Sequence, residues 1–471
     1  PVHSIFTRKG RRNMTNELEV NELIEQLEEL LEQKNYRAMK PLLEELPAAD
    51  IAEFLEELTI DRAMPVFRSL PKETAVEVFS YFEPETQENF ITSITDEEIG
   101  RIVEELSVDD AVDMLEELPA TIVKKVLKNA SAATRKTINQ FLNYPENSVG
   151  SIMTAEFTDI KGDMTVGEAI RYLRSVSDNK ETIYTCYIIS PSRELEGVVE
   201  LCDILACKDD NTLISDIMET GVVKACTTED REAAAGLFAK YDLTTLPVVD
   251  NENRLVGIVT VDDAVDVIEE EATKDIEQMA AMQPLETPYL KTGVFTIVKK
   301  RILWLLILMV AGTITGSILG KFEEAISAIP LLVTFMPMIF DTGGNSGSQA
   351  STTVIRGLTT GELECSDAPK ILWKELRVSV VVGVLFAAIN FVRVVLLTRD
   401  PDRVLIALVV SLAMLFTIVI AKSIGSVLPI LAKKLNFDPA VMAAPMITTL
   451  VDVCAMLVYF GLAIKLLAFR L

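Results

Sequence analysis

The sequence predicts a multidomain membrane protein, with an all-α superhelical N-terminal domain, an α/β tandem pair, a connecting helix and a five-helix transmembrane domain. Three observations predict this organisation. The 471 residues are too many for one hydrophobic core. Residues 1–297 carry 59 acidic and 28 basic side chains, whereas residues 298–471 carry 11 and 16. Long apolar segments are confined to the second of these regions.

Composition excludes several functional classes. The acidic first region disfavours nucleic acid, because phosphate binding needs Lys and Arg, and it favours cations. The six cysteines form no C-x-x-C pair, so we predict neither a disulfide framework nor a zinc site. The single histidine, His3, lies in residues 1–13, which we interpret as a leader foreign to the fold. No nucleophile–base pair or phosphate loop is visible, so we predict no enzyme.

Residues 14–149 are predicted to form an acidic α-helical superhelix. From residue 46 to 141 the sequence repeats every 12 residues, and each repeat opens with an apolar residue followed by helix-start chemistry. The repeats begin at Leu46, Leu58, Leu70, Phe82, Ile94, Leu106, Leu118 and Ala130. Units this short cannot bury a face alone, so they must stack. We expect a longer leading helix from about residue 17 to 33.

Residues 150–270 hold two related β–α units, about 150–214 and 215–270. In both, an I-M pair precedes a short strand, a polar stretch and an E-A pair that opens a helix. Each unit continues into two β-branched runs, which predict a strand pair. This pattern resembles a tandem pair of CBS domains.

The CBS resemblance implies a nucleotide site in the second unit. The segment Gly257–Asp263 matches the family element G-h-h-T-x-x-D, in which Thr260 and Asp263 would hold an adenosine ribose, as in ATP. The first unit has Glu200 where a hydroxyl is usual, which weakens a nucleotide site there. A purely structural or dimer-forming role for the pair is the alternative.

Residues 262–290 are predicted to form a connecting helix and linker. The carboxylates Asp263, Asp266 and Glu270 share one helical face, where like charges repel unless cations or basic groups lie near. A solvated helix face is the alternative interpretation. We expect Pro284 and Pro288 to end this helix.

Residues 291–471 contain five segments long and apolar enough to span a membrane. The predicted spans are Ile302–Gly320, Ala325–Ile355, Val378–Leu397, Val404–Leu431 and Pro439–Ile464. Lys and Arg gather before the first span and in the loops after the second and fourth spans. The positive-inside rule therefore predicts cytosolic N-terminal domains and a C-terminus outside.

The second span contains the sequence "FDTGGNSGSQ". We expect Gly343, Gly344 and Gly347 to break the helix near its middle, which is tolerated only inside protein or beside water. The freed carbonyls would join Asn345 as hard oxygen ligands. These features predict a cation path.

Asp452 is the only charged residue in the fifth span. A carboxylate at the centre of a membrane helix costs about 2.5–3.5 kcal/mol, so a function is expected. Thr448 supplies a hydroxyl on the same helix, and Asp438 lies 14 residues earlier, about 21 Å away at the inner end. The alternative is an internal salt bridge to Lys422 or Arg393.

The order of domains, with "GGNSGSQ", "FDPA" and "TTLVDV", resembles the MgtE family of magnesium channels over residues 17–471. The resemblance implies a homodimer that imports Mg²⁺ across the bacterial inner membrane through a pore on its two-fold axis. The implied pore residues are Asp452, Asn345, Thr448, Gly343 and Gly344. Cytosolic Mg²⁺ would close the pore through the connecting helix.

The resemblance also implies a set of regulatory ligands, carried over by position. They are Glu73, Glu105, Asp109, the carbonyl of Gly150, Asp230, Glu232, Asp242, Asp263, Asp266, Glu271, Asp275 and Asp438. Two departures stand out. Asp341 replaces a small residue and would add charge to the pore, and Lys274 replaces an acid and would weaken one sensing site.

Ligand chemistry favours magnesium independently, because Mg²⁺ keeps several waters and prefers oxygen ligands. Two functions compete with a channel. A secondary divalent-cation transporter, coupled to another ion, would also use a midplane acid. A non-transporting sensor would leave the glycine segment and Asp452 unexplained.

Overall fold

The computed structural model describes residues 17–177, 180–285, 289–290, 292–442 and 444–467. The predicted leader, residues 1–13, lies outside them. The chain divides into two compact units, Pro1–Ile268 and Glu269–Leu471.

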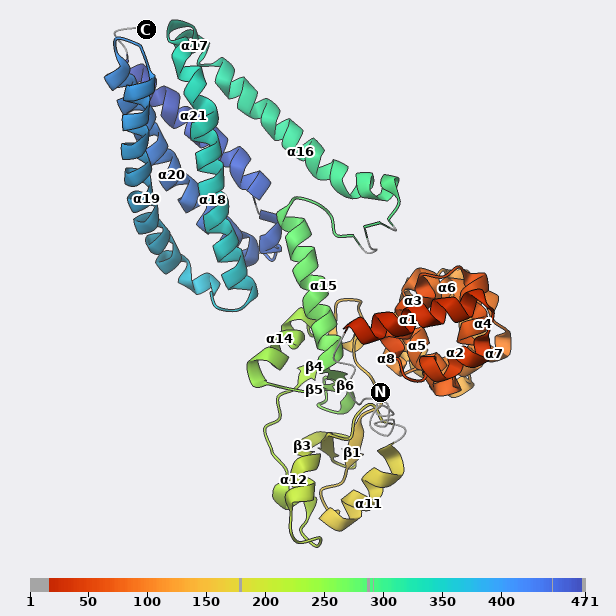
Figure 1. Cartoon of the computed structure of the whole chain (residues 1–471). Coiled ribbons are helices and arrows are strands. Elements are labelled where there is room, and N and C mark those ends of the chain that lie inside the picture. The colour runs from red at the N-terminus through yellow and green to blue at the C-terminus, as the bar shows by residue number, and fades with distance from the viewer. Residues whose placement is uncertain (1–16, 178–179, 286–288, 291, 443, 468–471) are drawn as a thin grey trace. The chain divides into compact units, whose positions relative to one another are not determined.

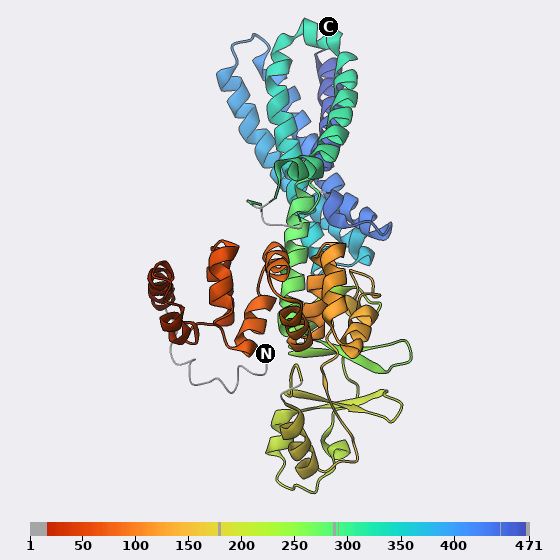
Figure 2. The same cartoon turned by 90° about the vertical axis from the view of Figure 1, so that its right-hand side faces the viewer.

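The first unit begins with a stack of short helices, which confirms the predicted helical domain. Two leading helices, α1 (Glu17–Glu32) and α2 (Tyr36–Leu43), precede eight that start 12 residues apart. These are α3 (Ala48–Glu56), α4 (Ile60–Phe67), α5 (Lys72–Ser80), α6 (Pro84–Ser93), α7 (Asp96–Glu105), α8 (Val108–Glu117), α9 (Ala120–Asn129) and α10 (Ala132–Phe141). Figures 1 and 2 show the short helices stacked together, and alternate helices, such as α3 with α5 and α7 with α9, are in contact.

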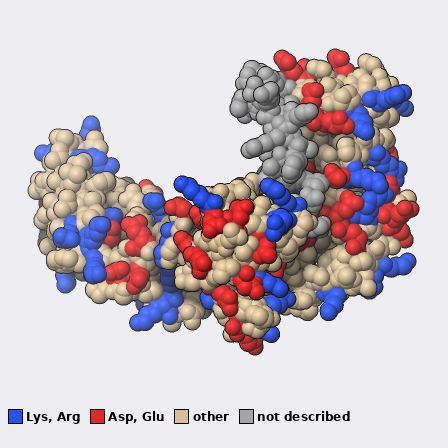
Figure 3. All heavy atoms as spheres, turned by 90° about the horizontal axis from the view of Figure 1, so that it is seen from below, with Lys and Arg blue, Asp and Glu red and all other residues tan. Residues whose placement is uncertain are grey.

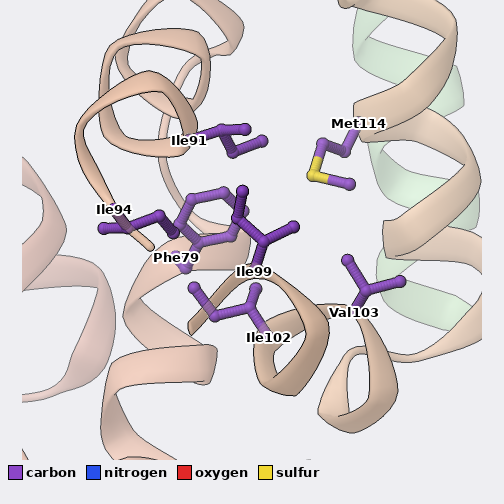
Figure 4. Close-up of a pocket in the computed structure, with 7 residues that line it drawn as sticks. All are labelled: Phe79, Ile91, Ile94, Ile99, Ile102, Val103 and Met114. Carbon is purple, nitrogen blue, oxygen red and sulfur yellow. The ribbon is translucent and has the colours of Figure 1, made fainter. Parts of the chain in front are cut away.

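A capping box starts α7, and apolar packing holds the stack of helices together. Thr95 accepts a hydrogen bond from the Glu98 backbone N–H, and the Glu98 carboxylate accepts one from the Thr95 N–H in return. Further inside, apolar side chains from α5 to α8 and the segments between them meet around Phe79 (Figure 4). Neighbouring repeats therefore share one core, as short repeats require.

Two similar α/β units follow, which confirms the CBS pair. The first has sheet order β1 (Thr158–Ile160), β2 (Thr185–Ile189), β3 (Leu195–Glu200), with α11 (Val166–Val176), α12 (Leu201–Ala206) and α13 (Ile214–Ile217). The second has β4 (Ala225–Cys226), β5 (Thr245–Val249), β6 (Leu255–Thr260) and α14 (Arg231–Tyr241). In both sheets the first pairing is parallel, and the second is antiparallel.

Helix α15 (Val261–Met279) follows the last strand directly. It ends before both prolines that we expected to stop it. Ala281 adopts a left-handed conformation with φ of 56°, so the chain turns before Pro284 is reached. Pro288 lies outside the described residues.

The second unit contains the long apolar helices. Among the described residues, four segments are long and apolar enough to cross a membrane: Val294–Gly320, Cys365–Leu397, Arg403–Lys434 and Pro445–Leu466. They correspond to α16 (Val294–Gly320), α19 (Ala368–Leu397, after a short turn), α20 (Arg403–Lys434) and α21 (Ala444–Leu466). Between α16 and α19 lie α17 (Glu323–Ala328) and α18 (Met336–Thr359).

The predicted break in the second span is wrong. Helix α18 runs without interruption through Gly343, Gly344 and Gly347. The glycines instead let α20 and α21 approach closely. A Cβ added to Gly343 would lie 2.6 Å from the Thr417 methyl, and one on Gly347 would lie 2.7 Å from Ile447. The helix keeps its own hydrogen bonds, so no carbonyls are freed for ions.

The closest backbone approach predicts a measurable packing constraint. A Cβ on Gly425 of α20 would lie 2.2 Å from the Gly347 carbonyl oxygen, and backbone cannot rotate away. We therefore expect Gly425→Ala to lower stability by about 1–3 kcal/mol. Thermal unfolding of the purified chain in detergent measures this. The matched control is Gly461→Ala in α21, where no atom lies within 4 Å; equal melting temperatures for the two variants would contradict the constraint.

Candidate functional site

Asp452 lies half-buried in α21, one helical turn after Thr448 on the same face. The Thr448 and Thr449 hydroxyls donate to the Pro445 carbonyl at 3.0 and 2.9 Å, so their oxygen lone pairs remain able to accept or coordinate. Among the described residues, Asp452 has no Lys or Arg within ion-pair distance.

The two cations proposed as alternative partners of Asp452 are engaged elsewhere. Lys422 Nζ lies 3.5 Å from Glu375 Oε2, and both side chains are buried between α20 and α19. Arg393 donates to Asn390 Oδ1 at 3.0 and 3.2 Å. The internal salt bridge to Lys422 or Arg393, which was the alternative interpretation of Asp452, is therefore not formed in the described part of the chain.

Helix α18 presents a continuous polar face that no other described residue of the chain covers. After Pro337, each exposed side chain of α18 is polar, and these recur every three or four residues. This polar stripe consists of Asp341, Asn345, Gln349, Thr352, Thr353, Arg356 and Thr359. The opposite face is buried against α20 and α21. Since hydrocarbon cannot satisfy polar groups, such a stripe needs water or another protein surface.

A cluster of carboxylates lies in the first unit, at the start of α15. It joins side chains from α8, from the first CBS unit and from the α15 N-terminus, as their mutual electrostatic interactions show. The members are Asp109, Asp110, Glu156, Glu181, Asp262 and Asp263. Asp109 is 8% exposed, and its Oδ1 has no hydrogen-bond partner. A buried, unpartnered oxygen among carboxylates fits a hard divalent cation.

Burial and mutual repulsion raise the affinity of these groups for protons. Burial and then the nearby Asp109 carboxylate raise the pKa of Asp263 to about 8. The same two causes raise the pKa of Glu181 to about 7 and also raise that of Glu156. Burial raises the pKa of Asp109 as well. The cluster is costly when fully ionised, so a bound cation would offset that cost.

The proposed nucleotide residues are in contact with each other. The Thr260 hydroxyl donates to Asp263 Oδ2 at 2.6 Å, and the Thr260 N–H donates to the same oxygen at 3.3 Å. Asp263 thus belongs both to the CBS element and to the carboxylate cluster. In the first unit, Glu200 lies with Cys202 and Asp203 in an exposed group close enough to share an ion.

At the C-terminal end of α15, which belongs to the second unit, Asp275 lies near the carboxylates of Asp438 and Glu271. Burial, followed by Asp438 and Glu271, raises the pKa of Asp275. Met279 packs with Ile355 of α18 and Ala440, two residues after Asp438. This places Asp275 of α15 near the entrance to α21.

Lys274 reduces the charge at this end of α15. Its Nζ lies 2.7 Å from Glu271 Oε2, so one predicted ligand is partly neutralised within the helix itself.

Two other predicted regulatory ligands lie at opposite ends of α14. Asp230 caps α14 by accepting from the Ala233 N–H, whereas Asp242 ends the same helix in a left-handed conformation. The 11 residues of α14 separate them by about 18 Å. Gly150 is buried, and a Cβ there would lie 2.6 Å from the Tyr144 ring. The remaining predicted ligands, Glu73, Glu105, Glu232 and Asp266, lie on α5, α7, α14 and α15.

Family models match three parts of the chain. A "Divalent cation transporter" model named MgtE matches residues 336–462, its "MgtE intracellular N domain" matches 46–147, and a CBS domain matches 214–270. The "Magnesium transporter MgtE" of Thermus thermophilus is 35% identical over 445 residues, covering 94% of this chain and 98% of the relative. This chain belongs to the MgtE family of magnesium transporters.

Further relatives of the chain are also named as magnesium transporters. The "Magnesium transporter MgtE" of Bacillus subtilis is 30% identical and covers 90% of each chain. Among solved structures, the "soluble part of a magnesium transporter" is 30% identical, with a TM-score of 0.51 over 54% of this chain and 99% of that one. The cytosolic domain of the Mg²⁺ channel MgtE in complex with ATP is 37% identical, with a TM-score of 0.49 over 51% of this chain and 98% of that one. As an MgtE protein, the chain is a membrane protein, and the two relatives that match most of its length are named magnesium transporters.

The sequence analysis did not predict four members of the carboxylate cluster around Asp109. Asp110, Glu156, Glu181 and Asp262 were not predicted as ligands, because they are scattered over more than 150 residues. No local motif marks Glu156 or Glu181. Only the fold of the first unit brings them to Asp109.

The raised pKa values predict how stability depends on pH. Between about pH 4 and 8, the folded cluster binds more protons than the unfolded chain, so stability should fall as pH rises through this window. Without divalent cations, the first thermal transition of the purified chain should therefore be lower at pH 8 than at pH 5. Added Mg²⁺ should restore it at pH 8.

The matched variants separate the cluster from general surface charge. Asp109→Asn should raise the transition at pH 8 without divalent cations and weaken its response to Mg²⁺. Asp61→Asn, an exposed change on the same superhelix, should do neither. A Mg²⁺ response that is the same in both variants would show that the cluster does not bind the ion.

Proposed function

We propose that this MgtE protein is a homodimeric channel that imports Mg²⁺ across the bacterial inner membrane and closes when cytosolic Mg²⁺ is abundant. The observation that carries the proposal is the uncovered polar stripe of α18 beside the unpaired Asp452. A second copy facing this stripe across a two-fold axis would enclose a polar path. Membership of a magnesium transporter family supports Mg²⁺ as the ion.

The proposed filter holds a hydrated ion. Two Asp452 carboxylates, one from each copy, would face the axis, with Thr448 and Asn345 supplying neutral oxygens nearby. Mg²⁺ dehydrates reluctantly, so it would bind through its water shell rather than by direct contact. Two carboxylates on one axis repel each other, and a divalent cation offsets that repulsion better than a monovalent one.

The proposed gate uses both ends of α15. Asp263 at its start belongs to the carboxylate cluster, and Asp275, about 18 Å along the helix, lies near Asp438. Mg²⁺ bound to these acids, in cytosolic domains, would remove the repulsion that favours an open arrangement. Several weak sites acting together would give a graded response.

A nucleotide is a proposed second ligand of the CBS pair. Thr260 and Asp263 form the contact that a ribose would share. Because Asp263 also belongs to the carboxylate cluster, ATP and Mg²⁺ would influence each other's binding there.

The filter is tested by removing its charge. Asp452→Asn should lower Mg²⁺ flux in proteoliposomes by roughly tenfold or more, equivalent to about 1.4 kcal/mol of lost ion stabilisation. Asp452→Glu should change the ratio of Mg²⁺ to Mn²⁺ and Co²⁺ flux more than the folding, because the charge remains. Wild-type flux in a correctly folded Asp452→Asn dimer would overturn the pore assignment.

Single-channel recording in planar bilayers separates a channel from a coupled transporter. A channel should give unitary Mg²⁺ currents without a second ion gradient. Flux that requires a proton or sodium gradient, with no unitary events, would favour the secondary transporter.

The gate is tested by removing acids from α15. Mg²⁺ should protect residues 262–290 from protease in the wild type, but not in the variant Asp263→Ala/Asp266→Ala/Glu271→Ala. The variant's flux should also lose inhibition by cytosolic Mg²⁺. A control with three exposed superhelix acids changed, Asp61, Asp96 and Glu97, should behave as wild type. If protection and inhibition both survive the α15 change, the gate lies elsewhere.

A further inference from the structure

The polar stripe of α18 is asymmetric in charge. Asp341 stands at its first turn, amides and hydroxyls occupy the middle, and Arg356 lies near the other end. Helix α18 begins on the side of the membrane that the positive-inside rule assigns to the outside. A cation entering along the stripe would therefore meet Asp341 first.

Helix packing places Asp341 close in level to Asp452. A Cβ on Gly344 would lie 2.7 Å from the Thr448 methyl, so these two residues mark a contact between α18 and α21. The pairs Gly343–Val451 and Gly347–Ile447 show that the helices run antiparallel.

Each acid lies one turn outward from the Gly344–Thr448 contact. Asp341 precedes Gly344 by three residues on α18, and Asp452 follows Thr448 by four on α21. Residues three or four apart share a helical face. Both carboxylates therefore project on the same flank of the packed pair, at nearly the same depth.

Asp341 has no described ion-pair partner. Arg393 of α19 reaches α18, where its Nη2 contacts Met338, three residues before Asp341. That guanidinium is held by Asn390 through two hydrogen bonds, and no ion pair with Asp341 is formed. The Asp341 charge is thus available to an ion in water rather than neutralised within the protein.

We propose that Asp341 is a second cation-selecting residue of the transport path, acting with Asp452 to concentrate hydrated divalent cations at the outer entrance. The inference rests on the proposed pore. In a dimer it gives four carboxylates at one level, two from Asp341 and two from Asp452. Such a ring attracts a divalent cation more strongly than a monovalent one and raises its local concentration.

The test measures Mg²⁺ flux in proteoliposomes against external Mg²⁺, with and without competing Na⁺. Asp341→Asn should raise the half-saturating Mg²⁺ concentration roughly 3- to 10-fold and increase inhibition by Na⁺, with little change in maximal flux. Asp341→Glu should retain most of the wild-type affinity, because the charge remains.

The matched control is Glu324→Gln in α17, an exposed acid on the same side of the membrane but outside the stripe. Its half-saturating concentration should stay at the wild-type value. Equal shifts in both variants would show general surface charge and overturn the proposal. A folded Asp341→Asn protein with lower thermal stability and an unchanged half-saturating Mg²⁺ concentration would show instead that the Asp341 charge stabilises the fold near Arg393.

Asp452→Asn, measured in the same preparation, separates the two proposals. If it abolishes flux while Asp341→Asn leaves affinity unchanged, the pore stands and the role of Asp341 fails. If neither change affects flux, the proposed pore itself fails. The proposal holds only if both variants change flux, each in its own way.

Discussion

Hydrocarbon cannot solvate a carboxylate or an unpaired amide, and the organisation of the membrane part depends on this constraint. Every polar side chain there must be paired, packed against protein or placed beside water. Lys422 and Glu375 satisfy the rule by pairing, and Arg393 does so through Asn390. In the described part of the chain, Asp452 and the charged and amide side chains of the α18 stripe do not find such partners, whereas Thr353 and Thr359 donate to backbone carbonyls. This difference separates structural polar groups from those available for transport.

The cytosolic carboxylate cluster follows the same physics at a different place. Asp109 is buried with one oxygen unpartnered, and it raises the pKa of its neighbours. Buried like charges are tolerated when a cation or a proton can neutralise them. The acids of the first unit and of the membrane helices therefore follow the same electrostatic principle. At each place, the fold leaves an electrostatic cost of unneutralised carboxylates, which a divalent cation can remove.

Glycine has a different role here from the one that its sequence context implies. The run around Gly344 predicts a broken helix, yet α18 is continuous, and the missing side chains admit α20 and α21. Close packing on one face of α18 forces its polar residues to the other. The packing of small residues is therefore what exposes the stripe.

The sequence by itself determined the helical repeats, the CBS pair and the isolation of Asp452, because these depend on local periodicity and on charge within one segment. The 12-residue spacing, for example, recurs in the first residues of α3 to α10. Only the tertiary structure decided that Glu156 and Glu181 join Asp109, that Lys422 pairs with Glu375, and that Asp341 lies level with Asp452. Those relations depend on which distant segments pack together, and no local pattern encodes them.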